Sequence, residues 1–354
     1  MDHRLWDRKT NTVYGESCLF FTGRSCRLLY RAERILRVYS PAAGITYEEG
    51  KDYIFSPESN SITLTETSSI FSFPPSVLTP DKETAVLYPA PGANAIAGGA
   101  NGSLLFFDEK ELFARKRIEV DYQAAPETEF LTAPEMEKGS LPRFTKLLRE
   151  KRNCNIILIG DSISFGSNAS KTVNVPPYAP PYIDLFVEEL QNLSGAEITF
   201  QNHAVSGTGC REASAIEEKW LAPPCDLLLV AYGTNDFARM DELEFRKTVA
   251  AIAEKKRSLH PETEVLFLSF LESNPLRVRS CPEKAGRFAE ELRKLAAEGE
   301  YYAYADIYTF WRKIAEKKDF YDLTGNGVNH PNDYGYRIYL YVLLSLFRGI
   351  FSSE

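Results

Sequence analysis

The feature that most constrains the fold is an alternation of short apolar runs and longer amphipathic segments, which begins near residue 141 and continues toward the C-terminus. The apolar runs predict strands at 155–159, 197–201, 226–231, 264–270 and 301–305. The amphipathic segments predict helices at 141–151, 182–193, 212–221, 241–259, 282–297 and 333–347. Strands and helices in alternation favour an α/β fold, in which helices cover both faces of a parallel sheet.

The first third of the chain has a different pattern. Short runs rich in aromatic and β-branched residues, separated by Gly and Pro, are typical of an all-β sandwich. We therefore expect a jelly-roll-like β-sandwich domain over residues 1–124, a linker and helix over 125–152, and the α/β domain over 153–354. The clearest runs are 18–21, 35–39, 61–65 and 104–107. Segment 89–102 is interpreted as turns, because no helix follows it to form a phosphate-binding loop.

Composition excludes several classes of partner and cofactor. The formal net charge of -8 offers no basic patch, so we expect no nucleic-acid partner. Four histidines disfavour a multi-histidine metal site, and we expect no metal or organic cofactor. The longest apolar run, 338–347, is too short to span a bilayer and predicts a terminal helix packed on the core, without a membrane partner.

Cysteine usage bears on the compartment. The six cysteines contain no C-x-x-C pair, so we expect reduced thiols in a cytoplasmic protein. The N-terminal residues show no apolar leader segment; the protein would be secreted if a leader has been removed.

The turn after the strand 155–159 carries a candidate nucleophile. The segment Gly160-Asp161-Ser162 would present Ser162 at the carboxyl edge of the sheet, near the positive end of the next helix. That position suits a nucleophile whose attack generates an oxyanion. The alternative is a structural turn in which a serine caps the helix.

Two further turns carry candidate oxyanion donors. Gly207 follows the second strand, and its backbone N–H is open to an oxyanion because no Cβ blocks the approach. Asn235 follows the third strand and can offer a side-chain N–H. The alternatives are an ordinary turn glycine and an Asx turn. A dinucleotide fingerprint at Gly207-Thr208-Gly209 is incomplete, since Glu212 stands at the third glycine position.

A candidate general base precedes the last helix. His330 is followed by Pro331, which stiffens the loop and could hold the imidazole in place. A single loop histidine is more often plain polar surface. Here Ser, Gly, Asn and His follow successive elements in a fixed order.

That order resembles the SGNH (GDSL-like) hydrolases. Ser162, Gly207, Asn235 and His330 match the family's four blocks over about residues 150–350. The resemblance implies a flavodoxin-like α/β/α sandwich and an acyl-enzyme mechanism. It makes Ser162 the nucleophile and His330 the base, and it forms the oxyanion hole from the N–H groups of Ser162 and Gly207 and the side chain of Asn235.

The chain departs from the family pattern at one position. The family usually has Asp three residues before the histidine, where this chain has Gly327. A backbone carbonyl could hold the imidazole instead, or Asp322 could fold back to it. Asp333 is expected to cap the last helix.

The domain order narrows the substrate. A β-sandwich before an SGNH domain resembles two-domain bacterial carbohydrate acetyl esterases, which implies an acyl ester of a small molecule or an oligosaccharide as substrate. Tyr178 or Tyr182 could form a rim for sugar stacking, and Phe165 or Phe237 could close the acyl pocket. The rival functions are a lipid esterase or thioesterase, and a non-catalytic carbohydrate-binding protein that keeps the fold.

Overall fold

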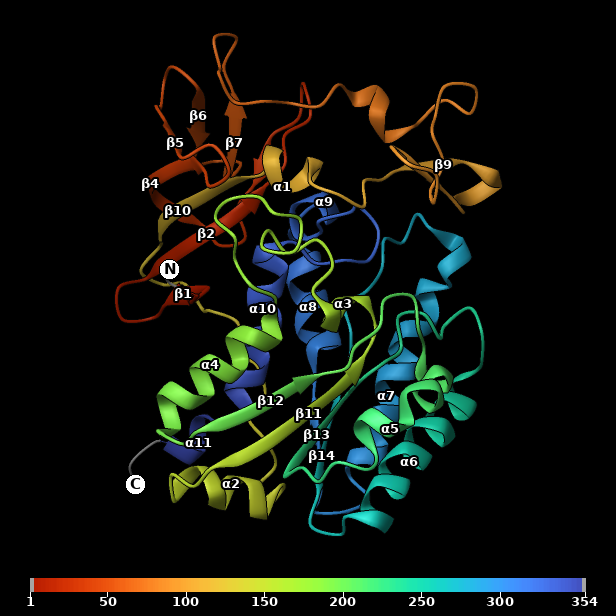
Figure 1. Ribbon diagram of the computed structural model, residues 1–354. Coiled ribbons are helices and arrows are strands. Elements are labelled where there is room, and N and C mark those ends of the chain that lie inside the picture. The colour runs from red at the N-terminus through yellow and green to blue at the C-terminus, as the bar shows by residue number, and fades with distance from the viewer. Residues whose placement is uncertain (1–2, 352–354) are drawn as a thin grey trace.

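A five-stranded parallel sheet forms the centre of the second part of the chain, in a computed structural model that describes residues 3–351 (Figure 1). Its strands are β11 (Cys154–Gly160), β12 (Ile198–Asn202), β13 (Leu227–Ala231), β14 (Glu264–Leu268) and β15 (Tyr302–Ala305). Their order across the sheet is β12-β11-β13-β14-β15, and each neighbouring pair is parallel. This order is that of flavodoxin-like folds, so the prediction of fold class is confirmed.

Helices cover both faces of this sheet (Figure 1). They are α2 (Pro142–Arg149), α4 (Tyr182–Ser194), α5 (Glu217–Trp220), α6 (Glu242–Leu259), α7 (Ala285–Ala296), α8 (Ile307–Ala315), α10 (Asp333–Leu346) and α11 (Arg348–Phe351). Alternate residues of one strand enter opposite cores: Ile156 packs with α4 and α10, whereas Ile157 packs with α6 and α7. Burial on both sides explains why the inner strands β13 and β14 are almost wholly apolar, whereas the edge strand β12 carries exposed polar residues.

The N-terminal part is antiparallel. One sheet has the order β1-β2-β10-β4-β5, a second has the order β3-β7-β6, and β8 pairs with β9. The strands are β1 (Trp6–Asp7), β2 (Thr12–Cys18), β3 (Cys26–Arg27), β4 (Ala32–Ser40), β5 (Ile45–Tyr47), β6 (Tyr53–Ser56), β7 (Ser61–Leu64), β8 (Ala95–Ala97), β9 (Leu104–Phe106) and β10 (Ile118–Ala124). Figure 1 places this part above α3 (Ser162–Phe165), at the carboxyl end of β11.

Several local predictions need correction. The run 18–21 is not a strand, because β2 ends at Cys18. The turn segment 89–102 contains the short strand β8. The helix predicted at 212–221 is split into the 3-10 helix η3 (Cys210–Ile216) and α5. The long apolar run near the C-terminus does form a helix packed in the core, namely α10.

The two parts share one hydrophobic core. Trp6, in β1, stacks on Phe130 and packs against Phe310 and Tyr341, which belong to α8 and α10. The expected domain division at residues 124 and 152 stays a prediction. No helix within residues 3–351 combines the length and hydropathy that a membrane crossing requires.

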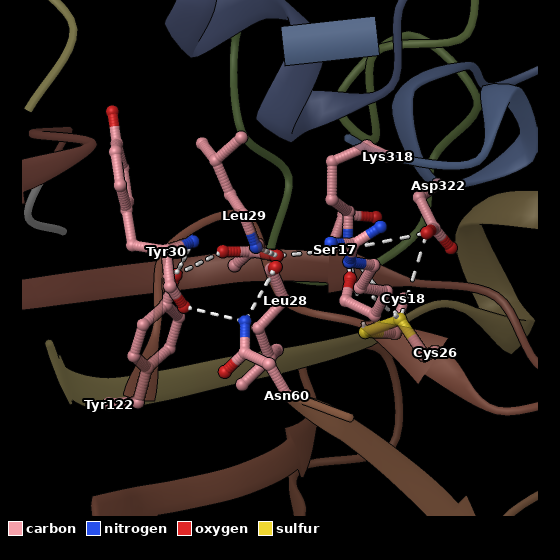
Figure 2. A network of polar contacts seen from close by, with 12 residues as sticks. Ser17, Cys18, Cys26, Leu28, Leu29, Tyr30, Asn60, Tyr122, Lys318 and Asp322 are labelled. Carbon is pink, nitrogen blue, oxygen red and sulfur yellow. Dashed lines mark hydrogen bonds and ion pairs between the residues drawn. A yellow bond between two sulfur atoms is a disulfide. The ribbon is translucent and has the colours of Figure 1, made fainter. Parts of the chain in front are cut away.

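A buried charge cluster also joins the two parts. The ammonium group of Lys318, between α8 and α9 (Phe320–Leu323), lies 2.9 Å from a carboxylate oxygen of Glu16 in β2 and 3.3 Å from one of Asp322 in α9. Burial opposes the charge of Lys318, but Asp322 and Glu16 outweigh it and raise its pKa. Figure 2 shows Lys318 and Asp322 reaching across to the N-terminal strands.

The expectation of six reduced thiols is wrong for one pair. Cys18 and Cys26 form a disulfide, seen beside Asp322 in Figure 2. The end of β2 and the start of β3 bring their Cα atoms to 6.0 Å, a proximity that follows from sheet packing and not from any spacing motif. The remaining cysteines are free, and they are Cys154, Cys210, Cys225 and Cys281.

Candidate active site

Ser162 lies where β11 turns into the short helix α3. The carboxylate of Asp161 caps that helix by accepting a hydrogen bond from the N–H of Ile163 at 2.9 Å. Gly160 is required because a Cβ there would lie 2.9 Å from the carbonyl oxygen of Ala231. The serine is 5% exposed, so the turn holds its hydroxyl in a nearly dry position at the carboxyl edge of the sheet.

His330 lies opposite this serine, in the loop before α10. The side-chain oxygen of Asn326 accepts hydrogen bonds from the backbone N–H groups of Val328, Asn329 and His330 at 2.9, 3.0 and 3.0 Å, and so fixes the loop. The imidazole Nε2 is then 2.9 Å from Oγ of Ser162. The structure therefore brings together two predicted residues that are 168 positions apart in the sequence.

The other imidazole nitrogen contacts a residue that the sequence did not indicate. Nδ1 of His330 lies 2.7 Å from Oδ1 of Asn168, and Nδ2 of Asn168 donates to the carbonyl oxygen of Lys110 at 3.2 Å. Because the Lys110 carbonyl can only accept, it fixes which way the Asn168 amide points. The amide oxygen then accepts the Nδ1 proton, which leaves Nε2 free to accept a proton from Ser162.

Neither predicted substitute for the missing acid contacts the imidazole. Nδ1 meets the Asn168 side chain, so the backbone-carbonyl hypothesis is wrong. Asp322 accepts from the N–H of Leu19 at 2.7 Å and pairs with Lys318. Asp333 is not the helix cap; Asn332 is, through the N–H of Gly335 at 2.9 Å.

Asp333 has a different partner set. Its carboxylate accepts from the N–H of Ser170 at 2.8 Å and forms a buried ion pair with Arg117, which precedes β10. This ion pair joins the N-terminal part of the chain to Asp333, the first residue of α10. The carboxylate therefore has a structural role beside the site.

Burial sets the protonation state of His330. Desolvation, assisted by the positive charge of Arg277, lowers the pKa of the imidazole to about 3. The side chain is 5% exposed and stays neutral across the physiological range. A carboxylate oxygen of Glu109 lies 3.4 Å from Nδ1, and burial raises the pKa of Glu109.

Gly207 and Asn235 occupy the neighbouring turns. Gly207 is exposed with φ 81°, and an added Cβ would meet no atom within 4 Å, so its requirement for glycine is conformational. Within the described chain, its N–H donates to no protein acceptor. Nδ2 of Asn235 donates to the carbonyl of Thr208 at 2.9 Å, which uses one of its two N–H groups.

Of the four aromatic candidates, two are buried in the core and two are exposed. Tyr182 is fully buried and its hydroxyl lies 2.7 Å from Oγ of Ser164, so it cannot be a rim for sugars. Phe237 packs inside the core against Phe270 and Phe288, away from any acyl pocket. Tyr178 and Phe165 are exposed, as a rim residue requires.

A family model described as the GDSL-like lipase/acylhydrolase family matches residues 158–338. That range includes Ser162, Gly207, Asn235 and His330. The comparison with curated proteins gives no match.

Among residues 3–351, no group of three or more His, Cys, Asp or Glu side chains could hold a metal ion.

Several solved structures are similar to the chain at low identity. A variant of an acetyl-xylooligosaccharide esterase from Geobacillus stearothermophilus is 19% identical, with 56% of this chain and 95% of that chain covered and a TM-score of 0.45. A member of the lipolytic G-D-S-L family from Veillonella parvula is 21% identical, with 55% and 97% covered and a TM-score of 0.41. A two-domain esterase active on acetylated mannans is 17% identical, with 60% and 53% covered and a TM-score of 0.47.

Proposed function

Because this chain belongs to the GDSL-like lipase/acylhydrolase family, we propose that it removes short acyl groups, above all acetyl, from carbohydrates. Ser162 and His330 perform the reaction through an acyl-enzyme. The observation that carries this proposal is the 2.9 Å contact between Oγ of Ser162 and Nε2 of His330, whose neutral tautomer is oriented by Asn168.

The reaction proceeds in two halves. Oγ of Ser162 attacks the ester carbonyl while Nε2 of His330 takes its proton, which gives a tetrahedral oxyanion and an imidazolium. The imidazolium then protonates the departing sugar oxygen as the C–O bond breaks, so that the sugar leaves with a free hydroxyl and the acyl-enzyme forms. Water repeats these steps, with His330 as its base, and releases the carboxylic acid and free Ser162.

Three donors surround the developing oxyanion in this proposal. They are the backbone N–H groups of Ser162 and Gly207 and the remaining side-chain N–H of Asn235. Donors that are already oriented before the reaction stabilise the transition state without reorganisation, which is why such sites are effective.

Asn235→Ala is expected to lower kcat on the order of 10²–10³-fold with little change in KM, because one oxyanion donor is lost. Steady-state kinetics on one acetyl ester measures this. The Thr208 carbonyl loses its partner as well, so thermal unfolding of the variant serves as the control for a shifted loop. A higher KM with unchanged kcat would make Asn235 a ground-state binding residue instead.

Polar groups that lie next to the exposed apolar side chains of Phe165 and Val205 are our reason for proposing a carbohydrate leaving group. Exposed Ser206 and Gly207 lie beside the site, and the guanidinium of Arg239 donates to the Gly207 carbonyl at 3.2 Å. Hydroxyl, amide and guanidinium groups suit the hydroxyls of a sugar. A lipid chain would need apolar surface instead, since its binding depends on burial of methylene groups.

We expect acetyl esters to be hydrolysed with at least about tenfold higher kcat/KM than octanoyl esters, because an enzyme for short acyl groups has a confined acyl site. A chromogenic ester series from acetyl to octanoyl measures this, followed by a panel of acetylated oligosaccharides. Equal or reversed rates would favour the lipid esterase or thioesterase. No turnover of any ester would favour a non-catalytic carbohydrate-binding protein.

A further inference from the structure

We propose that Glu109, from the N-terminal part of the chain, supplies the negative charge that stabilises the His330 imidazolium, in place of the acid missing from the last motif. The inference rests on the proposed Ser162–His330 chemistry and adds a positioning residue to it. Glu109 lies outside the segment that the family model matches, which begins at residue 158.

The geometry places this carboxylate at the right atom. Glu109 follows β9, and its Oε1 lies 3.4 Å from Nδ1 of His330, on the side of the ring away from Ser162. Its carboxylate also accepts a hydrogen bond from the side chain of Asn326, the residue that fixes the His330 loop. One carboxylate thus contacts both the imidazole and the loop that carries it.

The loop that bears Glu109 is itself held in place. The carboxylate of Asp108 accepts from the N–H of Lys110 at 3.1 Å and from that of Leu112 at 2.9 Å, so it closes a tight turn. The carbonyl of Lys110 in this turn accepts from Asn168. The N-terminal loop therefore fixes Asn168 and delivers Glu109 at the same time.

The same segment explains why the usual acid is absent. Gly327 stands where the family has Asp, with φ 77°. A Cβ at this position would lie 2.7 Å from the carbonyl oxygen of Phe106, the last residue of β9. The strand that brings Glu109 to the imidazole thus fills the space that an Asp side chain at position 327 would need.

Asn168 and Glu109 divide the work of a triad acid. Oδ1 of Asn168, 2.7 Å from Nδ1 of His330, fixes the tautomer of the imidazole. Because the amide is neutral, it adds no negative charge that could stabilise the imidazolium. Glu109 adds that charge. The positive charge of Arg277, in the loop after β14, has the opposite effect, because it repels the imidazolium. Burial disfavours it further, so a nearby anion has a large effect on the barrier.

This division predicts the pH dependence. His330, whose pKa is lowered to about 3, is neutral well below pH 6 and produces no acid limb there. Glu109 has a pKa raised above its ordinary 4.5, so it becomes protonated first as the pH falls. Protonation removes the negative charge, and the rate should fall with falling pH through the pKa of Glu109.

The test measures kcat on an acetyl ester and the rate at which a fluorophosphonate probe modifies Ser162, from acid to neutral pH. Glu109→Gln is expected to lower both on the order of 10- to 10³-fold at neutral pH, the effect of one opposite charge within about 6 Å. It should also remove the part of the acid limb that follows the pKa of Glu109, whereas the carboxyl of Asp161 beside Ser162, whose pKa burial raises to about 7, remains and titrates in the same range. Glu109→Asp should restore part of the rate together with the limb.

Two variants separate charge from structure. Glu111→Gln removes the same charge two residues away, from an exposed carboxylate that pairs with Arg115 at 3.0 Å, and should match wild type. Asn168→Ala should lower the rates but keep the acid limb, because Glu109 is still present. Thermal unfolding midpoints of all variants test for altered folding.

The inference is overturned if Glu109→Gln reacts within about threefold of wild type, a change too small for a lost neighbouring charge. It is equally overturned if the pH profile of Glu109→Gln below neutrality has the same shape as that of wild type, because the carboxyl of Asp161 would then account for the whole acid limb. In either case a wild-type enzyme that hydrolyses the ester and labels at Ser162 leaves the proposed function standing. If wild type neither hydrolyses the ester nor reacts with the probe, the proposed function itself fails.

Discussion

Replacement of Ser162 by alanine is expected to lower kcat on the order of 10⁴–10⁶-fold while the fold is kept, because the covalent route needs its hydroxyl. The hydroxyl is the partner of Nε2 of His330 at 2.9 Å, and no other hydroxyl contacts that nitrogen within the described residues. Steady-state hydrolysis of an acetyl ester gives kcat. Labelling by a fluorophosphonate, followed by intact-mass measurement, gives the covalent step.

Ser164→Ala is the matched control, since it removes a serine hydroxyl from the same short helix. Oγ of Ser164 contacts the hydroxyl of Tyr182 at 2.7 Å and makes no contact with His330. This variant should retain most of its kcat and lose about 1–3 kcal/mol of stability, because the buried hydroxyl of Tyr182 loses its partner. A Ser162→Ala enzyme with more than about a tenth of wild-type kcat would rule out Ser162 as nucleophile.

Replacement of Lys318 by methionine is expected to destabilise the protein by about 3–5 kcal/mol, because two buried carboxylates lose their cation. Without the ammonium group, Glu16 keeps the N–H of Leu29 and the hydroxyl of Tyr122 as donors, and Asp322 keeps the N–H of Leu19. Because Glu16 belongs to β2 and Asp322 to α9, the substitution should weaken the packing of the N-terminal part of the chain against the α/β part. Urea denaturation measures the free energy of unfolding.

Lys146→Met provides the comparison on the surface. Its side chain is 68% exposed and lies 3.9 Å from Glu150 on the same helical surface. Exposed substitutions of this kind usually change stability by less than about 0.5 kcal/mol. If Lys318→Met lost no more than Lys146→Met, the buried cluster would not hold the two parts together.

Much of the α/β part could be predicted from sequence because its signals are local. Strands β11 and β13 are buried on both faces, so the centre of each is an unbroken apolar run bounded by polar residues. Long helices such as α6 show a helical period in their apolar residues, and they follow a capping residue, here Asp241. Carboxyl ends of parallel strands meet at one edge, which is why Ser162 could be singled out before the geometry was known.

The short elements were harder to place. The helix α8 was not predicted at all, and α5 and η3 were predicted as one helix. Elements of one or two turns have few residues to define a period, and contacts with the rest of the fold decide whether they form. The same holds for β8, whose three residues lie among turn residues.

The sequence by itself predicted the parallel sheet, its longer helices except α8, and the pair Ser162 and His330, because each depends on residues close together in the chain or on the shared edge of a sheet. Tertiary structure alone decided the partners of the imidazole. Asn168 and Glu109 reach Nδ1 from a turn after α3 and from a loop after β9, and no spacing relates either of them to His330. Likewise, the Cys18–Cys26 disulfide and the pairing of Lys318 with Glu16 arise where the N-terminal strands meet the α/β part. Such contacts join side chains whose separation along the chain carries no periodic signal, so only the packed fold could reveal them.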